Sequence, residues 1–221
     1  MSEEFICCSN GNEQILDAQY WNSQYISNTT GWDLGKPSPP LVDFFKTIEN
    51  KDVRILIPGC GNAYEAKYLV NAGFSNITLI DISTDLVKKL QEKFAENTSV
   101  KVVLGDFFEL EGTFDLIVEQ TFFCALQPFM RSKYVQKMRN LLSENGQLVG
   151  LLFNRNFEKQ GPPFGGNTTE YMQVFKQNGL NMFEVESCKN SVAPRANSEI
   201  FFKAMKINGQ FEDQNPCCSL K

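Results

Sequence analysis

The sequence predicts one doubly wound α/β domain that spans residues 1–221. Short apolar segments rich in β-branched residues alternate with segments whose apolar residues recur at helical spacing. The connections between these segments are short, and no sequence period repeats along the chain. Such alternation is typical of a parallel sheet covered by helices, which binds its ligands at the carboxyl ends of the strands.

The first predicted strand and the turn after it are the most informative stretch. The first strand is predicted from an apolar run with several β-branched members, which is typical of a strand buried on both faces; its residues are Val53, Ile55, Leu56 and Ile57. Pro58 ends this run, and Gly59 and Gly61 allow a tight turn in which a ligand can approach the backbone. A helix follows, and a second apolar run ends at Asp81, twenty residues after Gly61. This order predicts a nucleotide-binding βαβ unit in which Asp81 accepts hydrogen bonds from ribose hydroxyls.

The residue at position 64 indicates which nucleotide this unit binds. A dinucleotide-binding fingerprint has a third glycine there, whereas this chain has Tyr64. A ligand with an adenosine and no phosphates is therefore favoured, such as S-adenosylmethionine, and an NAD-dependent enzyme is disfavoured. Because a glycine-rich turn is a weak signal by itself, a βαβ unit with an incidental turn stays an alternative.

The segment 12–37 holds a concentration of aromatic residues before the first strand. Both tryptophans of the chain, Trp21 and Trp32, lie in it together with Tyr20 and Tyr25. One interpretation is an N-terminal helix whose rings cap the hydrophobic core. The other is a lid that closes over an adenine ring, because flat aromatic surfaces and indole N–H groups suit a heterocycle.

The remaining elements follow from capping residues, apolar periodicity and turn signals. A helix is predicted over residues 131–142, with Asn145-Gly146 as its C-terminal stop signal. The polar residues 208–221 are expected to form a flexible tail. Three further helices are expected to begin at residues that favour N-caps. The first is capped by Ser38, has Pro39 at its first position and runs to about residue 49. The second is capped by Ser83 or Thr84, and the third by Thr168 or Thr169. The later strands are predicted over residues 77–81, 100–103, 114–118, 148–153, 180–185 and 199–205.

Chemically useful residues stand just beyond four of the predicted strands. Because the carboxyl ends of parallel strands meet at one edge of the sheet, we expect these residues to line one crevice. There Asp106 offers a carboxylate to the exocyclic amine of a base, and Phe107 offers a ring to its face. Each acid taken alone is also explained as an N-cap or a solvated turn. The expected lining residues are Gly59, Asp81, Asp106, Phe107, Glu119 and Gln120.

Composition excludes several classes of partner. The formal net charge is −5, from 21 basic and 26 acidic residues, so nucleic acid is not an expected partner. The chain opens with an acidic Met1-Ser-Glu-Glu segment and has no apolar run of transmembrane length, so neither secretion nor membrane insertion is expected. Seven cysteines, an odd number, are typical of free thiols in a reducing compartment, which indicates a cytoplasmic protein.

The chain contains no histidine, which removes the usual general base and the usual metal ligand. Its chemistry must use other side chains or need little proton transfer. The vicinal pairs Cys7-Cys8 and Cys217-Cys218 have no second Cys or His pair at zinc spacing. We therefore expect no metal site.

Four sequence blocks resemble one known family. They are GWDLGKP at 31–37, PGCG at 58–61, FFCALQP at 122–128 and GPPF at 161–164. With them the chain resembles S-adenosylmethionine-dependent methyltransferases of the thiopurine S-methyltransferase superfamily, closest to the thiol and halide methyltransferase branch. The resemblance implies a class I, Rossmann-like methyltransferase fold, with a seven-stranded, mostly parallel sheet whose last strand is antiparallel.

The resemblance also implies roles for individual residues. Trp21, Tyr25 and Trp32 would close over the cofactor, and Gln120 would lie near it. Gly59 would contact the amino-acid part of S-adenosylmethionine, Asp81 the ribose hydroxyls, and Asp106 and Phe107 the adenine. Arg131 would lie near the substrate, and Phe164 would gate its pocket. Tyr25 stands where plant relatives carry a third tryptophan, and Gln120 and Phe164 stand where they carry tyrosine, so the substrate is less well indicated than the cofactor.

The function predicted is methyl transfer from S-adenosylmethionine to a small soft nucleophile, such as a thiol, hydrosulfide, a halide or a thiopurine-like sulfur. Such acceptors arrive ionised and need no histidine base. Glu119 would be the base if the acceptor were instead an oxygen or nitrogen, and a non-catalytic S-adenosylmethionine-binding protein is a further alternative. The expected partner is a small-molecule substrate, and the expected state is a monomer or weak dimer.

Overall fold

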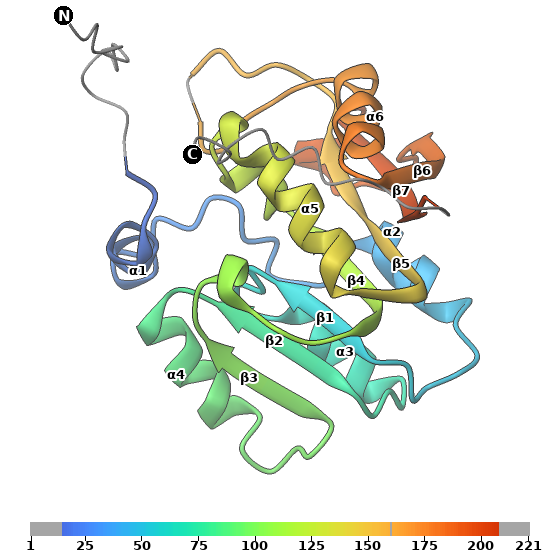
Figure 1. Ribbon diagram of the computed structural model, residues 1–221. Coiled ribbons are helices and arrows are strands. Elements are labelled where there is room, and N and C mark those ends of the chain that lie inside the picture. The colour runs from blue at the N-terminus through green and yellow to red at the C-terminus, as the bar shows by residue number, and fades with distance from the viewer. Residues whose placement is uncertain (1–14, 160, 208–221) are drawn as a thin grey trace, which may run out of the picture.

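The computed structural model describes residues 15–159 and 161–207, and they form one sheet with helices on both faces (Figure 1). The strands are β1 (Ile55–Pro58), β2 (Ile77–Asp81), β3 (Val100–Leu104), β4 (Phe114–Gln120), β5 (Leu142–Phe153), β6 (Leu180–Ser187) and β7 (Glu199–Lys206). Their order in the sheet is β3-β2-β1-β4-β5-β7-β6. Strands β1 to β5 pair in parallel, and β7 is antiparallel to both β5 and β6. The predicted seven-stranded α/β fold with an antiparallel last strand is confirmed.

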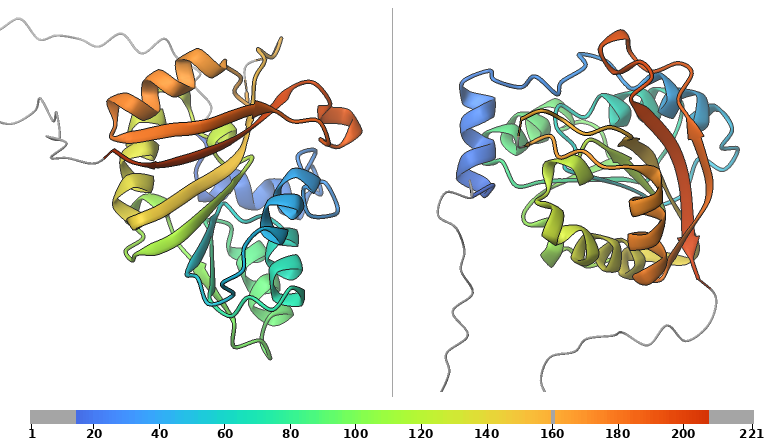
Figure 2. Two further views of the ribbon diagram at one scale, coloured as in Figure 1. Left: turned by 90° about the vertical axis from the view of Figure 1, so that its right-hand side faces the viewer. Right: turned by 90° about the horizontal axis from the view of Figure 1, so that it is seen from above.

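The helices divide between the two faces of this sheet. Seen from the side, α2, α3 and α4 cover one face and α5 and α6 the other (Figure 2). Their bounds are α1 (Ala18–Ile26), α2 (Pro39–Lys46), α3 (Tyr64–Asn71), α4 (Thr84–Lys93), α5 (Arg131–Leu141) and α6 (Thr168–Gln177). The structure also contains short 3-10 helices, which are η1 (Phe107–Glu109), η2 (Phe123–Ala125), η3 (Pro128–Met130) and η4 (Ala193–Arg195).

Alternation of side chains along β1 explains why both faces are buried. Ile55 and Ile57 pack into the core beneath α2, α3 and α4, together with Leu69 of α3. Leu56 points the other way, into the core that contains Val135 of α5. Successive strand residues point to opposite faces, so an unbroken apolar run requires helices on both sides.

Two helix boundaries differ from the sequence expectations. Asn167 caps α6, and its Oδ1 accepts a hydrogen bond from the Glu170 backbone N–H at 3.1 Å, so neither Thr168 nor Thr169 is the cap. Asparagine is among the strongest N-cap residues, which explains why it takes the position directly before the threonines. Ser38 and Ser83 precede α2 and α4 as expected, although α2 ends at Lys46 rather than near residue 49.

The Asn145-Gly146 signal was wrongly interpreted as the end of a helix. Helix α5 stops at Leu141 and β5 begins at once, so both residues lie inside β5. The pairing of β4 with β5 shifts between Phe114 and Leu116, because the four residues 143–146 loop out between the paired positions Leu142 and Gln147. The turn signal therefore produces an irregularity at the start of a strand.

The N-terminal helix α1 contributes no buried residue, and it contacts α4. Of the rings of segment 12–37, Tyr25 packs against the edge of the core, whereas Tyr20, Trp21 and Trp32 belong to neither core cluster. Residues 12–14 of that segment and the expected tail 208–221 lie outside the described residues. None of the helices described is both long and apolar enough to cross a membrane.

Candidate active site

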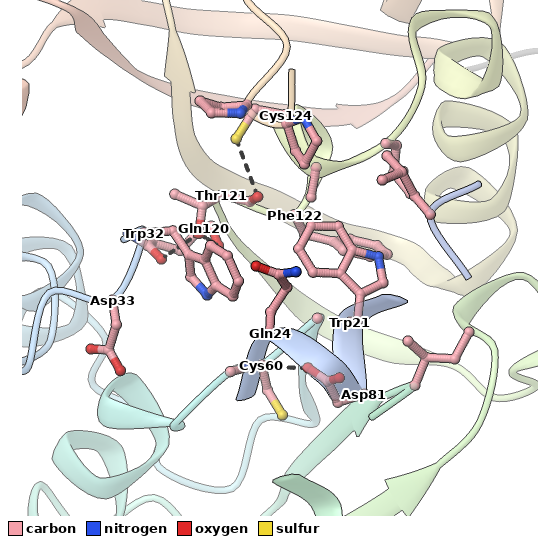
Figure 3. Close-up of a pocket in the computed structure, with 18 of the residues that line it drawn as sticks. Trp21, Gln24, Trp32, Asp33, Cys60, Asp81, Gln120, Thr121, Phe122 and Cys124 are labelled. Carbon is pink, nitrogen blue, oxygen red and sulfur yellow. Dashed lines mark hydrogen bonds between the residues drawn. The ribbon is translucent and has the colours of Figure 1, made fainter. Parts of the chain in front are cut away.

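A cavity of about 990 Å³ opens at the carboxyl ends of β1, β2 and β4, and α1 lies over it. This volume is at the upper end of the range of roughly 300–1,000 Å³ that small-molecule sites occupy. In Figure 3, Cys60 and Asp81 lie at one end and Thr121 and Cys124 at the other. The side chain of Gln24, from α1, reaches between the Trp32 and Phe122 rings. The cavity is therefore lined by elements that lie far apart in the sequence.

The turn after β1 brings backbone to the cavity wall. Gly59 has a φ of +54° and Gly61 a φ of +51°, a left-handed conformation that favours glycine. A Cβ on Gly59 would overlap the ring of Phe122, and a Cβ on Gly61 would lie 3.4 Å from Tyr25 Oη. These glycines leave room for Phe122 and Tyr25 to close on the turn from both sides.

Asp81 ends β2 and is 8% exposed at the cavity. Its Oδ2 accepts a hydrogen bond from the Gly61 N–H at 3.2 Å, and its Oδ1 accepts one from the Ser83 N–H at 3.0 Å. Burial raises the pKa of this carboxyl, while the backbone donors of Ser83 and Gly61 oppose the rise. Each oxygen retains a further lone pair, so Asp81 can still accept two hydroxyl groups.

Asp106 and Phe107 form the wall beyond β3. Asp106 caps η1, and its Oδ1 accepts a hydrogen bond from the Phe108 N–H at 2.9 Å. Phe107 is buried, with its ring 5.1 Å from the ring of Phe122 in an edge-to-face arrangement. Both residues line the cavity.

Glu119 and Gln120 are the last two residues of β4 rather than residues beyond it, and they point to opposite sides. Glu119 is fully buried and does not line the cavity. Its Oε1 accepts hydrogen bonds from the N–H groups of Phe122 and Phe123 at 2.9 and 3.0 Å, and its Oε2 accepts one from Tyr134 Oη at 2.7 Å. Burial raises the pKa of this carboxyl to about 7.

Gln120 lines the cavity, and its Oε1 accepts a hydrogen bond from Thr121 Oγ1 at 3.0 Å. Its Nε2 is buried and has no hydrogen-bond partner within residues 15–159 and 161–207. A buried amide without an acceptor costs stability unless a ligand supplies one. Thr121, the next residue, has a φ of +63°, which is strained for a β-branched residue and turns the chain sharply at the cavity.

Trp21, Tyr25 and Trp32 meet at the cavity. The ring of Trp32 lies 5.4 Å from that of Trp21 and 5.9 Å from that of Tyr25, both in edge-to-face arrangements. Burial raises the pKa of the Tyr25 phenol, with a further contribution from the nearby Asp81 carboxylate. All three side chains line the cavity, together with Gln24.

Arg131 and Phe164, which the resemblance places near the substrate, are not among the residues that line the cavity. Arg131 is buried, its Nη2 donates to the Gly165 carbonyl at 2.7 Å, and its guanidinium lies 5.0 Å from the Phe123 ring. The Phe164 N–H donates to the Cys124 carbonyl at 2.7 Å. Both residues instead fasten the GPPF loop to the segment after β4.

The sequence expectations missed the part of the cavity that follows β5. Arg155 and Phe157 come directly after β5, so the strand-end rule that found Asp81 would have indicated them. Arg195 lies on η4, four positions before the start of β7, so the rule that ligands bind at the carboxyl ends of strands does not indicate it. We call the part of the cavity lined by Phe122, Cys124, Phe153, Arg155, Phe157, Pro162, Pro163 and Arg195 the acceptor lobe.

Three cavity residues outside the acceptor lobe suit S-adenosylmethionine. Asp81 has oxygens available to the ribose hydroxyls, Asp106 has one to offer an adenine amine, and the unpartnered Gln120 amide can donate to a carboxylate. No cluster of acidic, cysteine or histidine side chains that would hold a metal ion occurs in the described parts of the chain.

Comparison with solved structures agrees with the topology. The CcbJ methyltransferase of Streptomyces caelestis superposes with a TM-score of 0.69 at 16% identity, over 87% of this chain and 99% of that one. At such identity the similarity establishes the fold alone.

Comparison with sequences goes further. A probable thiol methyltransferase of Arabidopsis thaliana is 32% identical over 184 residues, covering 81% of each protein. Thiocyanate methyltransferase 1 of the same plant is 28% identical over 193 residues, covering 85% of each. The family model for thiopurine S-methyltransferase matches residues 16–206. The chain therefore belongs to the thiopurine S-methyltransferase family of S-adenosylmethionine-dependent methyltransferases.

Proposed function

We propose that this methyltransferase acts on the sulfur of a small thiol that reaches the acceptor lobe as a thiolate. The observation that carries the proposal is the engagement of Glu119, whose two oxygens already accept three hydrogen bonds away from the cavity. The chain has no histidine, and the acceptor lobe contains no acidic side chain. An acceptor that needs deprotonation by the enzyme therefore finds no base there.

When bound, S-adenosylmethionine supplies an activated methyl group, because the electrons of its sulfur–methyl bond stay on the sulfur when the methyl group leaves. The acceptor therefore needs only its own electron pair to form the new bond. Asp81, Asp106 and Gln120 hold the cofactor in this proposal, with Trp21, Tyr25 and Trp32 of the lid segment 12–37 above it. All six of these side chains line the same cavity, which supports that assignment. Phe122 and Phe153 provide apolar walls that exclude water from the thiolate.

The one thiol of the acceptor lobe is held in its neutral form. Burial raises the pKa of Cys124 to about 12, and its Sγ donates to the Thr121 carbonyl at 3.2 Å. A neutral thiol is a poor nucleophile, so Cys124 does not compete with the substrate for the methyl group.

The pH dependence of the rate tests this proposal. With a series of thiols of different acidity, the pH at which kcat/KM reaches half its maximum should follow the pKa of each thiol. One fixed pKa for all acceptors, together with faster methylation of catechols or amines, would contradict it. Failure to methylate any thiol, halide, alcohol or amine while still binding S-adenosylmethionine would instead favour the non-catalytic alternative.

The remaining expectations stay part of this proposal. We infer a single-domain monomer or weak dimer that acts in the cytoplasm on a small molecule and not on nucleic acid. The free thiols of Cys60, Cys124 and Cys188 support a reducing compartment, and the net charge of −5 supports the exclusion of nucleic acid.

A further inference from the structure

Glu119 is a fully buried acid directly before the turn that follows β4. No lysine or arginine in the described residues forms an ion pair with it. Its partners are three hydrogen-bond donors, which are the N–H groups of Phe122 and Phe123 and the Tyr134 hydroxyl. Burying an acid without a counter-ion is unfavourable unless its oxygens accept such bonds. These three donors therefore account for a carboxyl group at this depth.

The two backbone donors hold the turn 121–124 at the wall of the cavity. Both N–H groups donate to the same atom, Glu119 Oε1, at 2.9 and 3.0 Å. Between this acid and the two donors stands Thr121, whose φ of +63° is strained for a β-branched residue. Strained backbone persists only where the surrounding contacts hold it, and it is concentrated at functional sites. Glu119 provides such contacts for this turn.

The turn sets the position of the Phe122 ring, which faces the cavity (Figure 3). The ring closes on the glycine turn after β1, where a Cβ on Gly59 would overlap it. It also lies 5.1 Å from the Phe107 ring in an edge-to-face arrangement. The same ring belongs to the acceptor lobe. Phe122 is therefore shared by the proposed cofactor site and the acceptor lobe.

The end of the same turn is joined to the GPPF loop. The Cys124 carbonyl accepts a hydrogen bond from the Phe164 N–H at 2.7 Å. Pro162 and Pro163, which directly precede Phe164, line the acceptor lobe. A displacement of the turn would consequently move two parts of the lobe, the Phe122 ring and the GPPF loop.

We propose that Glu119 is a positioning residue for methyl transfer. It lies outside the cavity and acts through the turn 121–124, which fixes the acceptor lobe relative to the methyl donor. Methyl transfer needs a close, aligned approach of the acceptor, and a displacement of about 1 Å can lower such a rate about a hundredfold. The inference rests on the proposed S-methylation and deepens it by naming the group that keeps the acceptor lobe in shape.

Three variants separate the hydrogen bonds of Glu119 from its charge and from the stability of the core. Glu119→Leu has a side chain of similar size without an acceptor, whereas Glu119→Gln keeps an Oε1 for both N–H groups and loses the charge. Val135→Ala is the control for stability, because Val135 is fully buried in the same core cluster and does not line the cavity. The measured quantity is the single-turnover rate of benzenethiol methylation by the full-length enzyme, with S-adenosylmethionine bound and the pH above the pKa of the thiol.

Glu119→Leu should lower this rate about tenfold to a hundredfold. Its affinity for S-adenosylhomocysteine should change less than about threefold, since Asp81 and Asp106 hold their positions without the turn. Glu119→Gln should keep the rate within about twofold, and Val135→Ala should melt at a lower temperature but keep the rate. A wild-type rate in Glu119→Leu would overturn the inference, as would equal losses in Glu119→Leu and either of the other variants.

Amide hydrogen exchange reports the position of the turn without turnover. In Glu119→Leu the N–H groups of Phe122 and Phe123 should exchange at least about tenfold faster than in the wild type, relative to the Ile57 N–H of β1. Glu119→Gln and Val135→Ala should keep the wild-type ratio. If the wild type methylates no thiol but this difference is found, the proposed function fails and the positioning of the turn by Glu119 stands. Equal ratios in Glu119→Leu and the wild type would overturn the inference whatever the activity.

Tyr134→Phe replaces Glu119→Leu if the latter does not fold. It removes the hydroxyl that donates to Glu119 Oε2 at 2.7 Å and keeps the buried ring. The carboxyl is then held less firmly, so the single-turnover rate should fall about threefold and the two amides should exchange about threefold faster. A rate and an exchange ratio equal to those of the wild type would overturn the inference.

Discussion

The side-chain oxygen of Asn22 accepts a hydrogen bond from Ser83 Oγ at 2.8 Å, although 61 positions separate the two residues. It also accepts one from the Asp85 N–H at 2.9 Å, and Asn22 Nδ2 donates to Asp85 Oδ2 at 2.6 Å. Ser83 donates its own N–H to Asp81 Oδ1. One asparagine thus fastens α1 to the same turn that orients the carboxylate proposed to hold the ribose.

Replacing Asn22 by alanine should therefore weaken S-adenosylmethionine binding by about threefold to tenfold, because three hydrogen bonds that hold α1 over the cavity are lost. Calorimetry measures the affinity, and thermal unfolding should change little because α1 has no buried residue. Ser23→Ala is the matched control, since the Ser23 hydroxyl bonds only within α1. Unchanged affinity in Asn22→Ala would mean that α1 does not act as a lid.

Replacing Asp81 by alanine should weaken S-adenosylmethionine binding at least about tenfold, since two charge-assisted hydrogen bonds to ribose would be lost. The exposed Asp43 on α2 provides a control, and Asp43→Ala should bind as the wild type does. Circular dichroism establishes that both variants are folded. If Asp81→Ala kept wild-type affinity, the cofactor would have to lie elsewhere.

Gly59→Ala should abolish cofactor binding and lower the free energy of unfolding by about 1–2 kcal/mol, because an L-residue is strained at this positive φ. The new methyl group would also displace the Phe122 ring from the cavity wall. Gly73→Ala serves as the control, since Gly73 also has a positive φ of +87°, a Cβ there meets no atom within 4 Å, and the residue does not line the cavity. This variant should lose stability to backbone strain and keep its affinity for the cofactor. Equal affinities of the two variants in calorimetry would show that the turn after β1 does not shape the cofactor site.

Glu119 should make the stability of the protein depend on pH. Burial raises the pKa of its carboxyl from 4.5 to about 7, so the folded state holds this proton more tightly than the unfolded state. The resulting stabilisation is complete below about pH 4.5 and is lost as the pH rises through about 7, by about 3 kcal/mol in total.

The variant Glu119→Gln keeps the shape of the side chain and does not titrate. Its Oε1 can still accept from the Phe122 and Phe123 N–H groups, whereas its Nε2 can only donate to Tyr134 Oη. Urea unfolding of both proteins between about pH 4.5 and 8.5 should show the advantage of the wild type shrinking as the pH rises. The exposed Glu96→Gln gives the background dependence. A constant difference between wild type and Glu119→Gln would mean that the carboxyl stays ionised throughout.

Local patterns in the sequence were sufficient for the sheet and for the part of the cavity that contains Asp81. These patterns depend only on neighbours in the chain. The apolar residues of segment 53–57 predict a buried strand, the two glycines predict a tight turn, and Asp81 marks a strand end. Because parallel strands end at one edge, Asp106 and Gln120 could be placed beside Asp81 without coordinates.

Only the tertiary structure decided which of the remaining groups face the ligand. Glu119 and Gln120 are adjacent in β4, yet the pleat turns one into the core beside Tyr134 and the other into the cavity. Arg131 and Arg155 look alike in the sequence, but Gly165 and Phe123 enclose the first while the second remains at the lobe without an ion pair in the described chain. Such differences depend on partners tens of residues away, which periodicity and spacing do not report, and the hydrogen bonds of Asn22 to Ser83 arise in the same way.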